Sequence, residues 1–211
     1  MTALVFALQS EQICIAMDTL VIGAKDRMPL YFQRKFLSIP ESDLVVAGTG
    51  HAGFINGWLQ FLQAHFRETT IDDLDAEVPG ILCASVEAVG GLDGLTATIY
   101  HFGYSIKECK YVGYVYRSER NFRSERLQEG LGYKPVIPIA TSDDIRFPDF
   151  LIGIILEQQR RDNLQPITER VGIGGEIEFV VMSDRLINVE TVYRFSSYES
   201  ELIQIGRRTK A

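Results

Sequence analysis

The first 50 residues consist of short apolar runs separated by polar turns, a pattern typical of antiparallel strands. Residues 3–8 and 13–17 are apolar, and the polar segment 9–12 between them predicts a β-hairpin. A second strand pair is predicted over 35–39 and 44–47, on either side of a Pro-Glu-Ser-Asp turn. The chain is therefore expected to build its core around β-sheets.

Helical periodicity replaces this pattern further along the chain. Apolar and aromatic residues recur at helical spacing over 54–65 and again over 71–86. Pro79 lies inside the second stretch and is expected to kink or split that helix. The basic tail at 207–210 is expected to be disordered. The remaining apolar runs predict three strands, a third helix and two final strands, over 96–104, 111–116, 135–139, 143–162, 177–182 and 187–195.

The order of these elements limits the architecture. Strands, two helices, strands, one helix and strands suit two sheets that pack face to face with helices outside. We therefore expect an α/β (α+β) protein with four layers in the order α/β/β/α. The 211 residues contain no fixed repeat and no Ser/Pro-rich linker, so residues 1–211 are expected to form a single domain.

Charge and cysteine content exclude several classes of protein. The chain has 21 basic and 28 acidic residues, a net charge of −7, which gives no general attraction to nucleic acid or anionic membranes. No apolar run approaches the ~20 residues that span a bilayer. The N-terminal segment lacks the basic region of a secretory signal, and Cys14, Cys83 and Cys109 form no CxxC pair. We expect a cytoplasmic protein with reduced cysteines that binds neither nucleic acid nor membranes.

The sequence contains no recognisable metal or cofactor motif. His51, His65 and His101 have no His or Cys partner at the spacing that metal sites use. A phosphate-binding loop, a nucleophile elbow and an H-E-x-x-H motif are all absent. The glycines within 172–175 follow a predicted helix, whereas dinucleotide-binding glycines follow a strand. No metal and no cofactor are therefore expected.

Thr2 is the strongest candidate for chemistry. Methionine aminopeptidases generally remove Met1 ahead of a small residue, which would leave a threonine with a free α-amino group. Such a residue combines a nucleophile with a base, because the hydroxyl attacks while the amine, with a pKa of about 8, accepts its proton. Threonine is also a common second residue with no catalytic role, so the neighbouring motifs decide between the two interpretations.

Three further motifs follow Thr2 in order. They are A-M-D-T at 16–19, K-F-L-S-I at 35–39 and A-G-T-G at 47–50, and Asp18 lies sixteen positions after Thr2. With the opening T-A-L-V-F-A-L, these motifs resemble the proteasome-type β-subunits and their bacterial relatives, in the N-terminal-nucleophile hydrolase superfamily. The later order of strands and helices is compatible with that family. The resemblance implies the family's fold, in which two antiparallel sheets are flanked by helices.

The resemblance also implies roles for four residues. Thr2 is the nucleophile, and the buried ammonium of Lys35 lowers the pKa of its hydroxyl. Asp18 compensates the charge of Lys35, since an unpaired buried ion costs several kcal/mol. The backbone amide of Gly50 donates to the oxyanion. In the alternative interpretation, Asp18 and Lys35 form an ordinary structural ion pair and Gly50 is a helix-entry residue.

The second half of the chain departs from the family pattern. Active proteasome-type subunits usually carry D-x-x-S-G-G after the third helix, and here the glycine pair is kept while Arg170 and Ile173 occupy the aspartate and serine positions. Losing those two groups removes hydrogen-bond partners of the N-terminal amine. Glu169 lies beside the missing aspartate and is a candidate substitute. A hydroxyl that usually precedes the third helix survives as Thr141 or Ser142.

The motifs together indicate an N-terminal-nucleophile amide hydrolase, in particular a threonine endopeptidase that acts on peptides or unfolded proteins. The pocket beside the nucleophile would be lined by Leu20, Thr49, Tyr31 and Phe32, which favours hydrophobic substrate side chains. Family members form rings, so the resemblance implies a homo-oligomeric ring; the sequence does not specify an ATP-dependent unfoldase partner. Two alternatives remain: a catalytically inactive, ring-forming subunit of the same fold, and an amidase for non-peptide amides.

Overall fold

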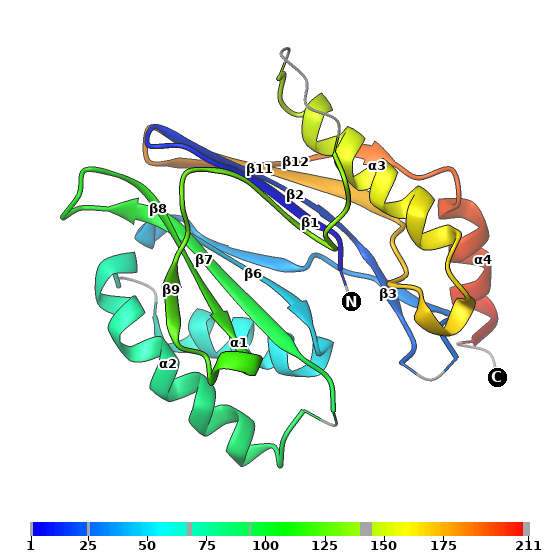
Figure 1. Cartoon of the computed structure of the whole chain (residues 1–211), viewed down its shortest axis with the longest axis horizontal. Coiled ribbons are helices and arrows are strands. Elements are labelled where there is room, and N and C mark those ends of the chain that lie inside the picture. The colour runs from blue at the N-terminus through cyan, green and yellow to red at the C-terminus, as the bar shows by residue number, and fades with distance from the viewer. Residues whose placement is uncertain (1, 25, 67–68, 93, 140–144, 209–211) are drawn as a thin grey trace.

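Two five-stranded antiparallel sheets form the centre of the molecule (Figure 1). The computed structural model describes residues 2–24, 26–66, 69–92, 94–139 and 145–208. The first sheet has the order β10 (Gly130–Lys134), β1 (Leu4–Leu8), β2 (Gln12–Asp18), β11 (Glu176–Ser183), β12 (Leu186–Arg194). The second has the order β5 (Phe36–Ile39), β6 (Leu44–Gly50), β7 (Ala97–Ser105), β8 (Lys110–Arg117), β9 (Ser124–Arg126). A small separate ribbon pairs β3 (Leu20–Ile22) with β4 (Pro29–Phe32).

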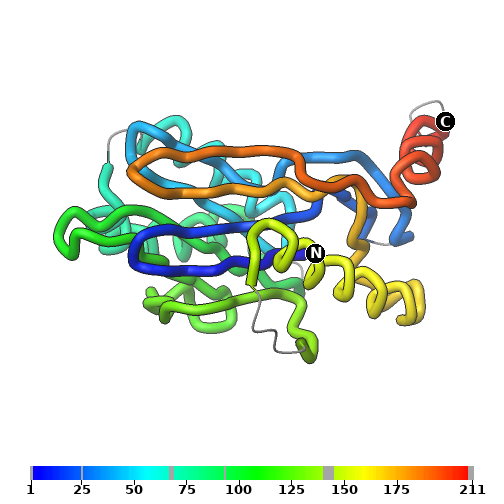
Figure 2. The backbone as a smooth tube through the Cα atoms, turned by 90° about the horizontal axis from the view of Figure 1, so that it is seen from above, coloured from blue at the N-terminus to red at the C-terminus, as the bar shows by residue number. Residues whose placement is uncertain are grey.

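Helices cover the outer faces of both sheets. In Figures 1 and 2, α1 (Ala52–His65) and α2 (Ile71–Ala88) lie on the second sheet, and α3 (Asp149–Asn163) lies on the first. The last helix, α4 (Tyr198–Arg208), packs against β4. Three short 3-10 helices, η1 (Pro40–Ser42), η2 (Ser118–Arg120) and η3 (Ile167–Glu169), complete the described elements. The predicted four-layer α/β/β/α sandwich of two antiparallel sheets is thereby confirmed.

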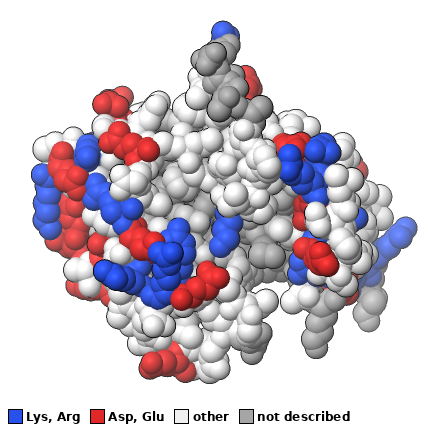
Figure 3. Space-filling model, viewed as in Figure 1, with Lys and Arg blue, Asp and Glu red and all other residues white. Residues whose placement is uncertain are grey.

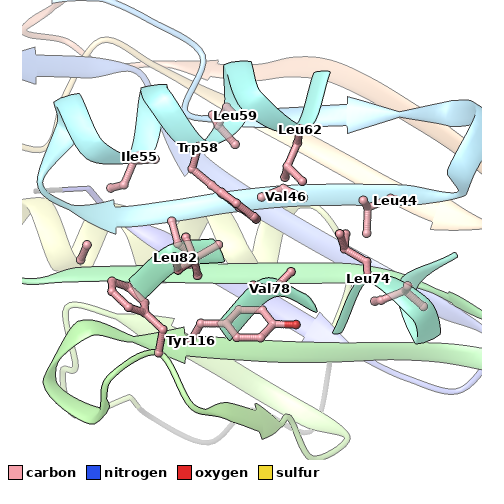
Figure 4. Close-up of a cluster of buried hydrophobic side chains, with 14 of the residues drawn as sticks. Leu44, Val46, Ile55, Trp58, Leu59, Leu62, Leu74, Val78, Leu82 and Tyr116 are labelled. Atoms are coloured by element: carbon pink, nitrogen blue, oxygen red, sulfur yellow. The ribbon is translucent and has the colours of Figure 1, made fainter. Parts of the chain in front are cut away.

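Alternation along each strand divides the core into three clusters. On β1, Leu4, Phe6 and Leu8 face the second sheet, whereas Val5 and Ala7 face α3. A third cluster lies between the second sheet and its two helices, and Figure 4 shows its side chains pointing from α1, α2 and the strands into one layer. Because helices or the opposite sheet cover both faces of β1 and β2, these strands are apolar at nearly every position.

The middle of the chain differs from the sequence prediction at two places. Pro79 does not split the predicted helix, since α2 runs without interruption from Ile71 to Ala88. Buried side chains on both sides of the proline, among them Leu74 and Leu82, hold its two halves against the second sheet. The strand predicted over 135–139 is not a strand; the strand in this part of the chain is β10, which ends at Lys134 and pairs with β1.

The C-terminal prediction also needs correction. Arg207 and Arg208 were expected in a disordered tail, and both belong to α4, while residues 209–211 lie outside the described part of the chain. The ring of Tyr198 stacks on Phe32 at a centroid distance of 4.6 Å, and Arg208 pairs with Asp26 at 2.7 Å. These contacts fasten α4 to the β3–β4 ribbon. Among the described residues, no helix is long and apolar enough to cross a membrane.

One titratable side chain is sealed in the core below α1. His101 on β7 is fully buried, and its Nε2 accepts a hydrogen bond from Trp58 Nε1–H at 3.2 Å. Its ring also meets the ring of Tyr116 edge-on at 4.9 Å. Burial lowers the pKa of His101 from 6.5 to about 3, because the apolar surroundings disfavour the imidazolium.

This burial predicts a pH-dependent stability. The unfolded chain takes up a proton on this imidazole near pH 6.5 and the folded chain does not until about pH 3, so the free energy of unfolding falls as the pH drops below 6.5. We expect His101→Gln, which keeps an acceptor but does not titrate, to remove about 2 kcal/mol of the loss between pH 7 and pH 5. Urea unfolding at both pH values measures this. The exposed His65→Gln serves as control, and equal pH slopes in both variants would contradict the assignment.

Candidate active site

The start of the chain is held against the end of β2. Thr2 is buried, with 7% of its surface exposed, and lies two residues before the first residue of β1. The neighbouring Ala3 donates its backbone N–H to Asp18 Oδ1 at 2.9 Å, and Asp18 donates its own N–H to the Ala3 carbonyl at 3.4 Å. The antiparallel pairing of β1 with β2 makes this contact possible, because it brings the first residue of one strand beside the last residue of the other.

Asp18 and Lys35 form a buried ion pair beside Thr2. Lys35 Nζ lies 2.9 Å from both carboxylate oxygens of Asp18, and both side chains are at least nine-tenths buried. The backbone N–H of Gly174 donates to Asp18 Oδ2 at 3.3 Å. The carboxylate therefore accepts from an ammonium and from two backbone amides, which offsets much of the cost of burying its charge.

Burial shifts the pKa values of the two partners in opposite directions. Removal from water raises the pKa of the Asp18 carboxyl, while the Lys35 ammonium and the two amides oppose the rise. The same burial lowers the pKa of Lys35, and its attraction to Asp18 opposes that change. Desolvation is the leading cause at both residues, so each depends on the other to stay charged.

Gly50 ends β6 with a conformation that excludes a side chain. Its φ is +111°, and a Cβ at this position would overlap the carbonyl oxygen of Thr96. In the ladder with β7, His51 donates its N–H to the Thr96 carbonyl at 2.9 Å, and Ala97 donates its N–H to Ser118 Oγ at 3.0 Å. Because adjacent residues of a strand point their amides to opposite sides, the Gly50 amide points away from β7, toward the side on which β5 begins.

Two cavities meet at Thr2 and Gly50. The first has a volume of about 50 Å³ and lies on the α1 side of β6; Leu20, Lys35 and Ile55 are among its lining residues. The second has a volume of about 440 Å³ and is lined by Thr2, Thr49, Gly50, Thr96, Tyr100, Arg117, Tyr133, Lys134, Pro135, Val136 and Val171. The structure thus brings together all four residues to which the sequence assigned catalytic roles, since Asp18 contacts both Ala3 and Lys35.

The four residues predicted to line one substrate pocket do not line a common cavity in the structure. Leu20 lines the small cavity and Thr49 the large one, so the two residues face different spaces. Tyr31 is 43% exposed, and Phe32 stacks on Tyr198 of α4. Neither Tyr31 nor Phe32 is among the described residues that line a cavity at Thr2.

The accessory candidates lie away from Thr2 or outside the described residues. Glu169 is exposed in η3, and the guanidinium of Arg170 donates to the carbonyls of Asn163 and Gln165 at the end of α3. Ile173 is buried against the helical side of the first sheet. Thr141 and Ser142 lie in the segment 140–144, outside the described part of the chain.

Two carboxylates that the sequence did not indicate hold the loop after α3. Asp162 accepts the backbone N–H groups of Val171 at 2.6 Å and Gly172 at 2.8 Å. Glu201 of α4 is buried and accepts the N–H of Gly175 at 2.9 Å. Neither carboxylate lies in a recognisable motif, so only the tertiary fold identifies them.

The described side chains form no ligand set for a metal ion. Within the described ranges, no group of three or more His, Cys, Asp or Glu side chains lies close enough together to hold a metal ion. The groups that the structure brings together at Thr2 are its hydroxyl, the backbone amide of Gly50 and the buried ammonium–carboxylate pair of Lys35 and Asp18.

The ion pair predicts a strong energetic coupling. We expect Lys35→Met and Asp18→Asn each to lower the free energy of unfolding by about 3–5 kcal/mol, because each leaves a buried charge without its partner. The double variant is expected to lose clearly less than the sum of the two. Urea unfolding of the four proteins measures the coupling energy.

A surface pair provides the control for this cycle. Glu157 accepts from Arg160 and Arg161 at 2.7 Å on the exposed side of α3, and Glu157→Gln is expected to cost less than about 1 kcal/mol. Strictly additive losses at Asp18 and Lys35 would show that the two side chains do not act as a pair.

Comparison with known proteins identifies the fold. No protein-family model and no curated protein matches the sequence. Anbu (ancestral beta-subunit) from Yersinia bercovieri has a similar structure, with a TM-score of 0.60 and 14% identity over 99% of this chain and 93% of that chain. The Anbu (Gly-1) mutant from Hyphomicrobium sp. strain MC1 gives a TM-score of 0.63 and 14% identity over 100% of this chain and 94% of that chain. The chain therefore has the proteasome β-subunit fold of the N-terminal-nucleophile hydrolases, as its motifs indicated.

Proposed function

We propose that the chain is an amide hydrolase whose nucleophile is the Thr2 hydroxyl, and specifically a threonine endopeptidase that acts in a homo-oligomeric ring in the cytoplasm. The observation that carries the proposal is the buried Lys35–Asp18 pair, which lies beside Thr2 and shares a cavity with it. Such a pair is expensive to bury, and here it lies next to the one residue that can supply an N-terminal nucleophile. The similar solved structures are described as β-subunits, which supports the ring.

The reaction needs Thr2 to be the first residue, so Met1 must be removed. The Thr2 Oγ then attacks the carbonyl carbon of the substrate amide while the α-amino group takes the hydroxyl proton. When the tetrahedral intermediate collapses, the C–N bond breaks and that proton passes to the leaving amine. Thr2 is left as an ester. Water, deprotonated by the same amine, cleaves the ester and releases the carboxylic acid.

Lys35 and Gly50 stabilise the charges that develop in these steps. The Lys35 ammonium favours the Thr2 oxygen as it becomes negative, and Asp18 keeps Lys35 charged in its buried position. The Gly50 amide, which points away from β7, is placed to donate to the oxyanion. Each group is fixed by backbone or ion-pair contacts before substrate binds, so little reorganisation is needed during the reaction.

A second candidate function is a catalytically inactive subunit of the same fold. It is favoured by the loop after α3, where Arg170 binds the end of the helix and Ile173 packs in the core. Arg170 and Ile173 therefore replace the aspartate and serine that usually hydrogen-bond the N-terminal amine in proteasome-type subunits. An amidase for non-peptide amides keeps the mechanism and changes only the substrate, and a panel of peptide and non-peptide amides separates it from the peptidase.

The state of the N-terminus tests the proposal. We expect the intact mass of the purified protein with a native N-terminus to lack one methionine. Treatment with an α′,β′-epoxyketone, which bonds to both the hydroxyl and the amine of an N-terminal threonine, is then expected to add a single adduct. Thr2→Ala is expected to give none.

Two further variants make the result specific. Lys35→Met is expected to slow adduct formation at least tenfold in folded protein. Lys110→Met, at a half-buried lysine that lines neither cavity at Thr2, is expected to leave the rate unchanged. A retained Met1 with no adduct would refute the hydrolase and favour the inactive subunit. An adduct that persists in Thr2→Ala would place the nucleophile elsewhere.

A further inference from the structure

The two cavities at Thr2 differ in what they can hold. The small one, at about 50 Å³, has room for one or two waters, since a water occupies about 30 Å³ in the liquid. The large one, at about 440 Å³, falls within the range of small-molecule binding sites. A substrate group beside the scissile amide therefore fits only the large cavity.

The large cavity opens between the two sheets. Thr49 follows Val45 and Ala47 on the face of β6 that packs against the first sheet, so its side chain points inward. Lys134 ends β10 at the edge of the first sheet, and its Nζ donates to Thr98 Oγ1 of β7 at 3.1 Å. The cavity is thus bounded by both sheets.

Two basic residues, Arg117 and Lys134, line the large cavity, and only Arg117 is paired with a carboxylate of the described residues. Arg117 pairs with Glu125 at 2.7 Å. Figure 3 shows basic and acidic residues interspersed over one face of the molecule. No carboxylate of the described residues lies within ion-pair distance of Lys134 Nζ. Desolvation lowers the pKa of Lys134, the more distant Glu119 opposes that change, and Arg117 adds to it. A negative group in the cavity would offset the cost of removing the Lys134 ammonium from water and would reduce the repulsion between Lys134 and Arg117.

The hydroxyl of Thr49 is a second, independent feature of the large cavity. Thr49 is 1% exposed, and its buried Oγ1 has no hydrogen-bond partner among the residues that the structure describes. Unpartnered buried hydroxyls are costly and uncommon in folded proteins. A hydroxyl donor and an ammonium that line one space match the oxygens of a carboxylate, which accepts hydrogen bonds and carries the opposite charge.

We propose that this cavity is a carboxylate-binding subsite formed by Lys134 and Thr49, and that the amide substrates of Thr2 carry a carboxylate on the acyl side of the scissile bond. The substrate assignment rests on the proposed function. It differs from the hydrophobic preference indicated by the sequence, because the cavity at Leu20, at about 50 Å³, is too small for a large apolar side chain.

Matched inhibitors test the substrate class. Epoxyketones that differ only in Glu against Gln, or Asp against Asn, next to the reactive ketone have the same size and differ in charge. We expect wild-type protein to react at least tenfold faster with one acidic probe than with its amide. Lys134→Met is expected to bring this ratio close to one by slowing the reaction with the acidic probe. Lys134→Arg, which keeps the charge, is expected to retain a preference, and Lys110→Met to leave it unchanged.

A binding measurement separates the subsite from the nucleophile. In Thr2→Ala protein, glutarate monoamide is expected to raise the melting temperature more than glutaramide does, and Lys134→Met or Thr49→Val to abolish the difference. Stabilisation by the monoamide without labelling by any probe would support the subsite and refute the proposed hydrolase. Labelling with equal rates for acidic and neutral probes, or equal stabilisation by both amides, would overturn the subsite.

Discussion

The carboxylate of Asp18 is the contact on which the rest of the site depends. It lies at the end of β2, between β1 and β11 in the sheet, and those neighbours supply the amides of Ala3 and Gly174. Lys35 reaches it from the segment that leads into β5 of the other sheet. One buried charge therefore joins three segments that are far apart in sequence. Because an unpaired charge at this depth is so unfavourable, it fixes the position of the chain start relative to both sheets.

The loop after α3 holds the Gly174 amide at Asp18, although Arg170 and Ile173 replace the aspartate and serine that the resembling family usually has there. Asp162 and Glu201 each accept backbone amides of the loop, one on either side of the glycine that binds Asp18. These contacts turn Ile173 into the core, where it packs beneath α3. The loop conformation is thus set by carboxylates from two helices. A side chain at position 173 is consequently used for packing and not for polar contact with Thr2.

The sequence predicted the parts of the structure that have a local pattern. The hairpin of β1 and β2 and the helices α1 and α2 follow from the hydrophobic pattern, whereas the motif around Asp18 was identified by its resemblance to proteasome-type β-subunits. β10 was missed because G-L-G-Y-K has no strand pattern of its own and is stabilised by pairing with β1. α4 was missed because it is largely polar and is held by Glu201 and by stacking on Phe32. The large cavity was also missed, since its lining comes from strands of different sheets.

The geometry at the end of β6 explains why the short motif A-G-T-G at 47–50 contributes residues to both cavities. Successive residues of a strand point to opposite faces, so the side chain of Thr49 enters the space between the sheets. Gly50 lines both cavities, and a side chain has no place there because its Cβ would overlap the Thr96 carbonyl oxygen. The positive φ of Gly50 then ends the strand and directs the chain into α1. A shift of one residue in the pairing with β7 would exchange the two faces, so the ladder from Leu44 to Gly50 fixes both the amide and the hydroxyl at once.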